Sequence, residues 1–179
     1  MPSPMSSPPP LSMKEVAEAI SKGEVVAWFQ GRSEFGPRAL GSRSILADPR
    51  DPKMPERINS RVKKREDFRP FAPSVLAEEA HNWFEGLPVD GSPFMSITAP
   101  VPPALVGQVP AVCHVDGSSR LQTVRREDNP LYHSLISAFK KLTGVPMVLN
   151  TSFNVMGEPI VDSPTGEWGV SRRKENGHL

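Results

Sequence analysis

The chain has 179 residues, of which 37% are apolar and 21 are proline, and its formal net charge is +1. This length suits one domain with a hydrophobic core, and a net charge so close to zero argues against general nucleic-acid binding. No apolar run is long enough to cross a membrane, the N-terminus lacks the pattern of a signal peptide, and the single cysteine, Cys113, excludes an internal disulfide. We therefore expect a cytoplasmic protein.

The first 29 residues predict a disordered lead-in, a helix and a strand. Residues 1–12 are rich in Pro and Ser, a composition that disfavours packed structure. Ser12 and Glu15 have the spacing of a capping box, so a helix should begin there and end at Gly23. The apolar run at 25–29 then predicts a short strand that is buried on both faces.

Later elements follow from the same signals. We expect strands at 44–47, 73–76, 94–98 and 145–149, helical turns at 54–61 and 77–84, a proline-rich surface loop at 100–110, and a β-hairpin made of 111–116 and 120–124. A longer helix should start at Pro130 and end at Gly144. Its apolar face is predicted to consist of Leu131, Leu135, Ile136, Phe139 and Leu142. Strands interleaved with helices indicate an α/β fold.

Positive charge is concentrated between Gly31 and Pro70. This stretch holds eleven Lys or Arg residues and six Asp or Glu residues, a surplus of five in a chain whose total is +1. Glycine and proline interrupt the charges, as in pockets where guanidinium groups and backbone N–H groups converge on an anion. A solvated, salt-bridged surface is the alternative interpretation.

Three clusters of residues are candidates for a binding site. Lys63 and Arg65, reinforced by Arg69, point to one side if 63–65 is extended, and they suit a phosphorylated ligand. The second cluster, Asn150, Thr151, Ser152 and Asn154, follows a buried strand and offers hydroxyl and amide groups. The third consists of His114, Asp116 and Arg120. Each cluster could instead be structural, through surface charge or turn capping.

Several common motifs are absent from the sequence. It contains no phosphate-binding P-loop, no dinucleotide-binding glycine fingerprint and no G-x-S-x-G nucleophile elbow. A nucleotide site, if present, must use another scaffold.

Four blocks of the sequence, in the same order, resemble the C-terminal domain of the O-carbamoyltransferase family, which includes nodulation-type and antibiotic-tailoring carbamoyltransferases. The blocks are GRSEFGPRALGSRSILADPR, INSRVKKREDFRPFAPSVL, HVDGSSRLQTV and VLNTSFNVMGEPIV. The resemblance covers residues 13–164. It implies a YrdC-like fold, a twisted mixed α/β sheet with flanking helices around a basic cavity.

The resemblance also implies a function. Family domains of this type bind ATP, with Mg²⁺ accompanying it, and carbamoyl phosphate, and they form carbamoyl-adenylate. A separate metal-containing, Kae1-like transfer domain or subunit then passes the carbamoyl group to a hydroxyl acceptor. The isolated chain should therefore perform only the adenylate-forming half.

The family signature K-x-R and S-x-N corresponds to Lys63, Arg65, Ser152 and Asn154. By this resemblance Lys63, Arg65 and Arg120 are the catalytic candidates, which would hold phosphate and carbamoyl oxygens. The candidates for substrate or nucleotide binding are Arg38, Arg43, Arg69, His114, Asp116, Asn150, Thr151, Ser152 and Asn154. We expect no metal site in the protein itself.

The family pattern continues through a final helix and strand, which the polar residues 165–179 do not resemble. We therefore expect a domain at 13–164, a YrdC-like fold that can lack its C-terminal helix and strand, and an atypical polar tail. Two other functions remain open. One is a threonylcarbamoyl-adenylate synthase-like enzyme of tRNA modification, and the other is a catalytically silent nucleotide-binding module.

Overall fold

The computed structural model describes residues 12–63, 70–155 and 157–162. Strands in these ranges form one six-stranded mixed sheet in the order β1-β2-β6-β3-β5-β4. Only β3 and β5 pair in parallel, and the other neighbours are antiparallel. The strands are β1 (Val26–Phe29), β2 (Arg43–Ala47), β3 (Ala72–Leu76), β4 (Ile97–Pro100), β5 (Ser118–Val124) and β6 (Met147–Ser152). The predicted α/β fold with a mixed sheet is confirmed.

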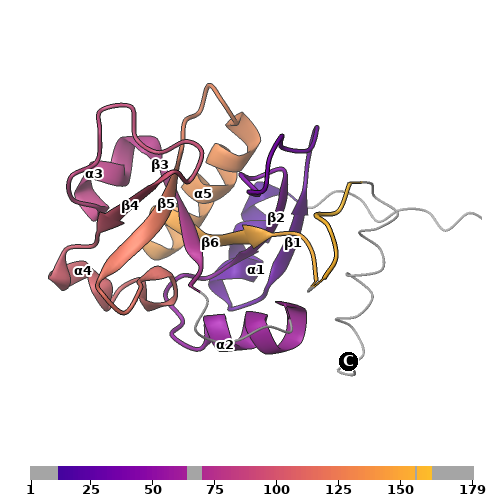
Figure 1. Cartoon of the computed structure of the whole chain (residues 1–179), viewed down its shortest axis with the longest axis horizontal. Helices are drawn as coiled ribbons and strands as arrows, with labels where there is room; N and C mark the ends of the chain where they lie inside the picture. Colours follow the sequence, from indigo (N-terminus) through magenta and orange to yellow (C-terminus); the bar gives the residue numbers. More distant parts are fainter. Residues whose placement is uncertain (1–11, 64–69, 156, 163–179) are drawn as a thin grey trace, which may run out of the picture.

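Two helices, α1 (Met13–Ser21) and α5 (Pro130–Thr143), pack against each other and cover one face of the sheet (Figure 1). Their apolar sides and the strands make the main hydrophobic core. The remaining helical segments are short: α2 (Met54–Ile58), α3 (Ala80–Trp83), α4 (Pro103–Val106), the 3₁₀ turns Ala77–Glu79 and Pro110–Val112, and the π-helical turn Asn59–Lys63.

Capping residues fix the start of α1 and both ends of α5, at the positions that the sequence predicts. Ser12 and Glu15 form the capping box, in which the Ser12 N–H donates to Glu15 Oε2 at 2.8 Å and the Glu15 N–H donates to Ser12 Oγ at 3.3 Å. Asn129 accepts a hydrogen bond from the Tyr132 N–H at the start of α5, and Gly144 ends that helix in the left-handed conformation. These caps satisfy backbone groups that the helices leave unpaired.

The predicted apolar face of α5 is partly wrong. Its buried residues are Tyr132, Leu135, Ile136 and Phe139, whereas Leu131 and Leu142 remain 54% and 47% exposed. The buried face of α5 is centred on Tyr132 and Phe139. Both leucines lie at the border of this face, so the sheet does not cover them.

Strand β1 is not buried on both faces, contrary to our prediction. Among the described strands β1 lies at the edge of the sheet and pairs only with β2, and Trp28 is its one buried residue. A continuous apolar run specifies a strand here, but the number of neighbours depends on pairing between distant segments.

The predicted hairpin before β5 is also wrong in its first half. Residues 110–112 form a 3₁₀ turn, and β5 pairs instead with β4 and β3. The turn itself is present, because the Gly117 N–H donates to His114 O at 3.0 Å and Gly117 has a φ of 77°. The surface loop expected at 100–110 contains α4, and Lys63 ends a π-helical turn instead of lying in extended backbone.

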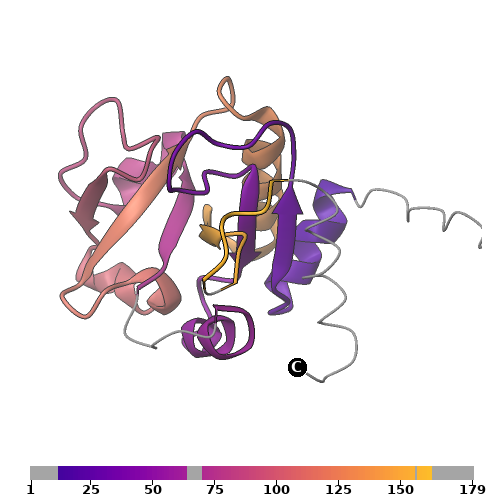
Figure 2. The ribbon, with the colours of Figure 1, turned by 45° about the vertical axis from the view of Figure 1, so that its right-hand side comes forward.

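The segment 30–42, which joins β1 to β2, lies at the end of the sheet near the start of α5, where Gln30 Nε2 donates to Asn129 Oδ1 at 2.7 Å (Figure 2). Side chains form hydrogen bonds with the backbone N–H and C=O groups of this segment. Trp28 Nε1 and Gln30 Nε2 donate to Gly41 O at 2.7 and 2.8 Å, and Glu34 Oε1 accepts from Leu40 N and Ser42 N at 2.7 Å each. This segment, called the basic loop below, is therefore held in place although it has no helix or strand.

Replacement of Gly41 tests how closely the basic loop approaches α5. Gly41 has a φ of 103°, and an added Cβ would lie 2.2 Å from Cδ1 of the fully buried Tyr132. We expect Gly41→Ala to lower the free energy of unfolding by about 3 kcal/mol, because backbone strain and overpacking add. Urea denaturation measures this loss.

Gly144→Ala is the matched control. Gly144 also has a positive φ, 79°, but a Cβ added there would meet no atom of another segment within 4 Å. This variant should lose only about 1 kcal/mol, the cost of the backbone conformation alone. Equal losses in the two variants would contradict the packing of Gly41 against Tyr132.

Candidate functional site

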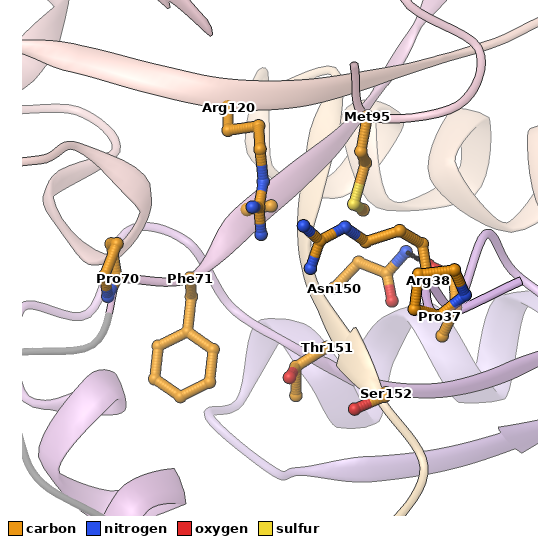
Figure 3. Close-up of a pocket in the computed structure, with 11 residues that line it drawn as sticks. Pro37, Arg38, Pro70, Phe71, Met95, Arg120, Asn150, Thr151 and Ser152 are labelled. Atoms are coloured by element: carbon orange, nitrogen blue, oxygen red, sulfur yellow. Dashed lines mark hydrogen bonds between the residues drawn. The ribbon is translucent and has the colours of Figure 1, made fainter. Parts of the chain in front are cut away.

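A pocket of about 100 Å³ lies where the basic loop meets the start of β3 and the strands β5 and β6 (Figure 3). Its lining residues are Pro37, Arg38, Ala39, Pro70, Phe71, Ala72, Met95, Arg120, Asn150, Thr151 and Ser152. Pockets for drug-sized ligands are usually about 300 Å³ or more. This pocket therefore has room for a small anion, and a nucleotide would have to extend beyond it.

Two arginines bring positive charge to the pocket from different elements. Arg38 comes from the basic loop and Arg120 from β5, and their side chains point toward a common space in Figure 3. Neither guanidinium forms an ion pair or hydrogen bond with the described part of the chain. Burial lowers the pKa of the Arg120 guanidinium, and the positive charge of Arg38 lowers this pKa further. A bound anion would relieve both effects.

The alternation of β5 explains why Arg120 faces the pocket. Successive side chains of a strand point to opposite faces, so Arg120 and Gln122 share one face and Leu121 takes the other. Leu121 is fully buried in the hydrophobic core. The core therefore fixes the strand with Arg120 on the side of the basic loop.

Three buried polar side chains on adjacent strands connect the sheet to the basic loop. Gln122 on β5 donates from Nε2 to Leu40 O at 2.9 Å, and its Oε1 accepts from Ser74 Oγ on β3 at 2.7 Å. Asn150 on β6 donates from Nδ2 to Ser74 Oγ at 2.9 Å and to Ala39 O at 3.0 Å. We call these three residues the amide network. It holds the loop segment that carries Arg38.

Lys63, Ser152 and Asn154 form a second polar cluster beside the pocket. Lys63 is 4% exposed, and its ammonium donates to Ser152 O, to Ser152 Oγ at 3.1 Å and to Asn154 Oδ1 at 2.8 Å. Ser152 Oγ also donates to Asn154 Oδ1 at 2.7 Å. Ser152 lines the pocket, so it joins this cluster to the arginines.

The structure thus brings seven of the predicted site residues together. Arg38, Arg120, Asn150, Thr151 and Ser152 line the pocket, while Lys63 and Asn154 contact Ser152. Arg65 and Arg69 lie outside the described residues.

Arg43 lies outside the pocket lining and has a structural environment. It is 4% exposed, and its guanidinium donates to Gln30 O at 2.8 Å and to Gly31 O at 3.1 Å. The same group lies 3.5 Å from the centroid of the Phe29 ring. Arg43 therefore fixes the start of the basic loop, and a direct contact with a ligand stays a prediction.

His114 and Asp116 also lie outside the pocket lining, in the turn before β5. Asp116 is exposed, and its carboxylate accepts from Ser118 Oγ at 2.6 Å and from Ser118 N at 2.9 Å, which lowers the pKa of the carboxyl group. Burial lowers the pKa of His114, and Arg120 adds to this effect while Asp116 opposes it. Both residues serve the turn, and ligand contacts for them stay predictions.

Sequence reasoning did not select Met95 as part of the site. Met95 is 5% exposed, lines the pocket and has a φ of 54°, the one positive value for a non-glycine residue in the described ranges. Its backbone conformation depends on tertiary contacts and leaves no signal in the sequence. Five further lining residues were also missed individually, although they lie inside the first two of the four sequence blocks: Pro37, Ala39, Pro70, Phe71 and Ala72.

The described residues contain no group of three or more His, Cys, Asp or Glu side chains that could hold a metal ion. None of the helices in these ranges is long and apolar enough to cross a membrane.

Comparison with known proteins identifies the family. The family model described as "Carbamoyltransferase C-terminus" matches residues 17–176. Nodulation protein NolNO of Sinorhizobium fredii is 58% identical over 149 residues, which cover 82% of this chain and 22% of NolNO. The 3'-hydroxymethylcephem-O-carbamoyltransferase of Amycolatopsis lactamdurans is 43% identical over 157 residues, which cover 86% of this chain and 28% of that enzyme. The chain thus spans about a quarter of the length of these relatives.

Among solved structures, the HypF protein of T. kodakarensis has a similar fold, with a TM-score of 0.59 and 16% sequence identity. The similarity covers 90% of this chain and 19% of the HypF chain. It confirms the YrdC-like α/β fold that the sequence predicts. Because the family model matches most of the chain, this protein belongs to the carbamoyltransferase family, and the matched part corresponds to the C-terminal domain of that family.

Proposed function

We propose that this chain binds carbamoyl phosphate and ATP and forms carbamoyl-adenylate, the donor for O-carbamoyl transfer to a hydroxyl acceptor. The observation that carries the proposal is the pair Arg38 and Arg120, two cations without a partner in the described chain that face one small pocket. Guanidinium groups bind carboxylate and phosphate oxygens through two parallel hydrogen bonds. The pocket volume of about 100 Å³ favours a compact anion such as carbamoyl phosphate at this position.

The reaction requires two steps for its atoms to balance. Water first cleaves the phosphate from carbamoyl phosphate, which leaves carbamate and inorganic phosphate. A carbamate oxygen then bonds to the α-phosphorus of ATP, and the bond from that phosphorus to pyrophosphate breaks. Both steps need charge neutralisation and in-line positioning more than a protein nucleophile, which agrees with a site made of arginines, a lysine and neutral amides.

The second polar cluster suits the nucleotide side of this reaction. The buried ammonium of Lys63 contacts Ser152, which lines the pocket, so it would stabilise charge on phosphates bound beside Ser152. Ser152 and Asn154 would then bind ATP where it extends out of the pocket. Magnesium would enter with ATP, held by phosphate oxygens and water, because Mg²⁺ commonly binds through substrate phosphates.

In this proposal, a different domain or subunit transfers the carbamoyl group to the hydroxyl acceptor. We propose that a Kae1-like domain or subunit receives the carbamoyl-adenylate, in line with the share of the relatives' length that this chain spans.

Binding of carbamoyl phosphate should depend on Arg120. We expect carbamoyl phosphate to raise the melting temperature of the protein, because a ligand that binds only the folded state stabilises it.

Arg120→Ala should raise the Kd of carbamoyl phosphate by roughly tenfold to a hundredfold, because a charge-assisted hydrogen bond is lost. Isothermal titration calorimetry measures the Kd. Arg125→Ala is the control, since Arg125 donates to Asp90 O at 2.9 Å and does not line the pocket. Equal affinities of Arg120→Ala and Arg125→Ala would contradict the site.

Adenylate formation should depend on Lys63. The chain should catalyse exchange of labelled pyrophosphate into ATP only when carbamoyl phosphate is present. Lys63→Ala should lower the exchange rate by a factor on the order of a hundred, because a preorganised charge is lost. Arg65→Ala should do the same, because Arg65 shares the K-x-R family signature with Lys63. Lys53→Ala, at an exposed position, should leave the rate unchanged.

The same assay separates the other two functions. Exchange that requires threonine and bicarbonate, and not carbamoyl phosphate, would identify a threonylcarbamoyl-adenylate synthase. A folded protein that binds ATP without any exchange would be a silent nucleotide-binding module. Either result would overturn the proposal.

A further inference from the structure

We propose that the free edge of β1 pairs with β1 of a second copy of this chain, antiparallel and about a two-fold axis, so that the two sheets become one. Among the described strands β1 lies at one end of the sheet (Figure 1). None of the residues that line the pocket belongs to β1. The pairing is therefore independent of the proposed function, and failure of either proposal leaves the other intact.

The backbone groups of Ala27 and Phe29 point away from β2. The Gln30 N–H donates to Ser42 O at 3.0 Å, so Gln30 directs its N–H group toward β2. Residues that bond to the neighbouring strand alternate with residues that do not in an antiparallel pair, so Trp28 also bonds to β2. Ala27 and Phe29 take the alternate positions, and no described residue forms a backbone hydrogen bond with them at the free edge.

The two edges of the described sheet differ in how they are protected. At the other edge, β4 ends at Pro100, whose C=O accepts from the Glu85 N–H at 2.9 Å. Proline and a bound loop are features that keep an edge strand from pairing with another chain. Residues 25–29 read VVAWF and contain neither proline nor charge. The edge of β1 is therefore suited to pair with another strand.

A two-fold axis at Trp28 gives the pairing a defined register. It places Ala27 of one copy opposite Phe29 of the other, so that each outward N–H meets an outward C=O and four hydrogen bonds form. The side chains of Ala27 and Phe29, which are half-buried in the single chain, then become a cross-strand pair of an apolar and an aromatic residue. A shift by one residue would oppose outward groups with groups that already bond to β2.

Charges beyond the ends of β1 favour the same register. Glu24 precedes the strand and Arg32 follows it, and both side chains are exposed and form no ion pair with the described residues. Antiparallel pairing brings Glu24 of each copy toward Arg32 of the other, so two attractive contacts form. A shift by two residues would instead bring Arg32 toward Lys22, or Glu24 toward Glu34, and like charges repel.

The mass of the whole chain in solution tests the pairing. Light scattering after size-exclusion chromatography should show a mass that approaches two chains as concentration rises. Ala27→Pro removes an outward N–H from each copy and leaves the bonds to β2, so it should raise the Kd of the dimer by roughly tenfold to a hundredfold. A monomer at every concentration, an unchanged Kd in the variant, or growth beyond two chains would overturn the proposal, because a two-fold pairing closes at two.

Charge reversal tests the register and keeps the proposal falsifiable if Ala27→Pro fails to fold. Glu24→Lys and Arg32→Glu should each raise the dimer Kd about tenfold, because two repulsive contacts replace two attractive ones. An equal mixture of these two variants should recover the dimer, since residue 24 of each then faces the opposite charge at residue 32 of the other. Glu85→Lys makes the same charge change at an exposed position beside β4 and should leave the Kd unchanged. A dimer that neither reversal weakens, or a mixture that stays monomeric, would overturn the proposal.

Discussion

The amide network is the constraint on which the rest of the site depends. It joins β6, β3 and β5, three neighbours in the middle of the sheet, to the carbonyl groups of Ala39 and Leu40. Without these bonds the basic loop would be an irregular segment that carries a charged side chain, and such a segment has many conformations. The network replaces regular secondary structure as the means of positioning Arg38 opposite Arg120.

The site separates its two tasks between charged and neutral groups. The arginines and Lys63 provide attraction for anions, which is strong but carries little information about the shape of a ligand. The amides and Ser152 add no charge and bind groups in defined directions. Because the neutral groups belong to strands and the Arg38 side chain to a loop, the directional part of recognition lies on the more rigid part of the fold.

Features that depend on neighbouring residues could be predicted from the sequence, and features that depend on distant pairing could not. The α1 capping box and the end of α5 at Gly144 were correct because their signals are local. The edge position of β1 and the partner of β5 were wrong because an apolar run does not specify its neighbours. The four sequence blocks identified Lys63, Ser152 and Asn154 as a group, and the structure joins them. The bonds of Asn150 to the basic loop and the conformation of Met95 follow from contacts across the sheet, which no sequence pattern reveals.

The position of β6 has a consequence for how the domain folds. Among the described strands β6 comes last along the chain, yet it lies between β2 and β3 and supplies the partners of Lys63, 89 and 91 residues away. During synthesis on the ribosome, β2 and β3 must wait, unpaired along these edges, until residue 152 has emerged. Contacts over such separations close slowly, and exposed strand edges favour aggregation in the interval. Production at low temperature or with chaperones should therefore influence the yield of folded protein more than it would for a domain with local strand pairing.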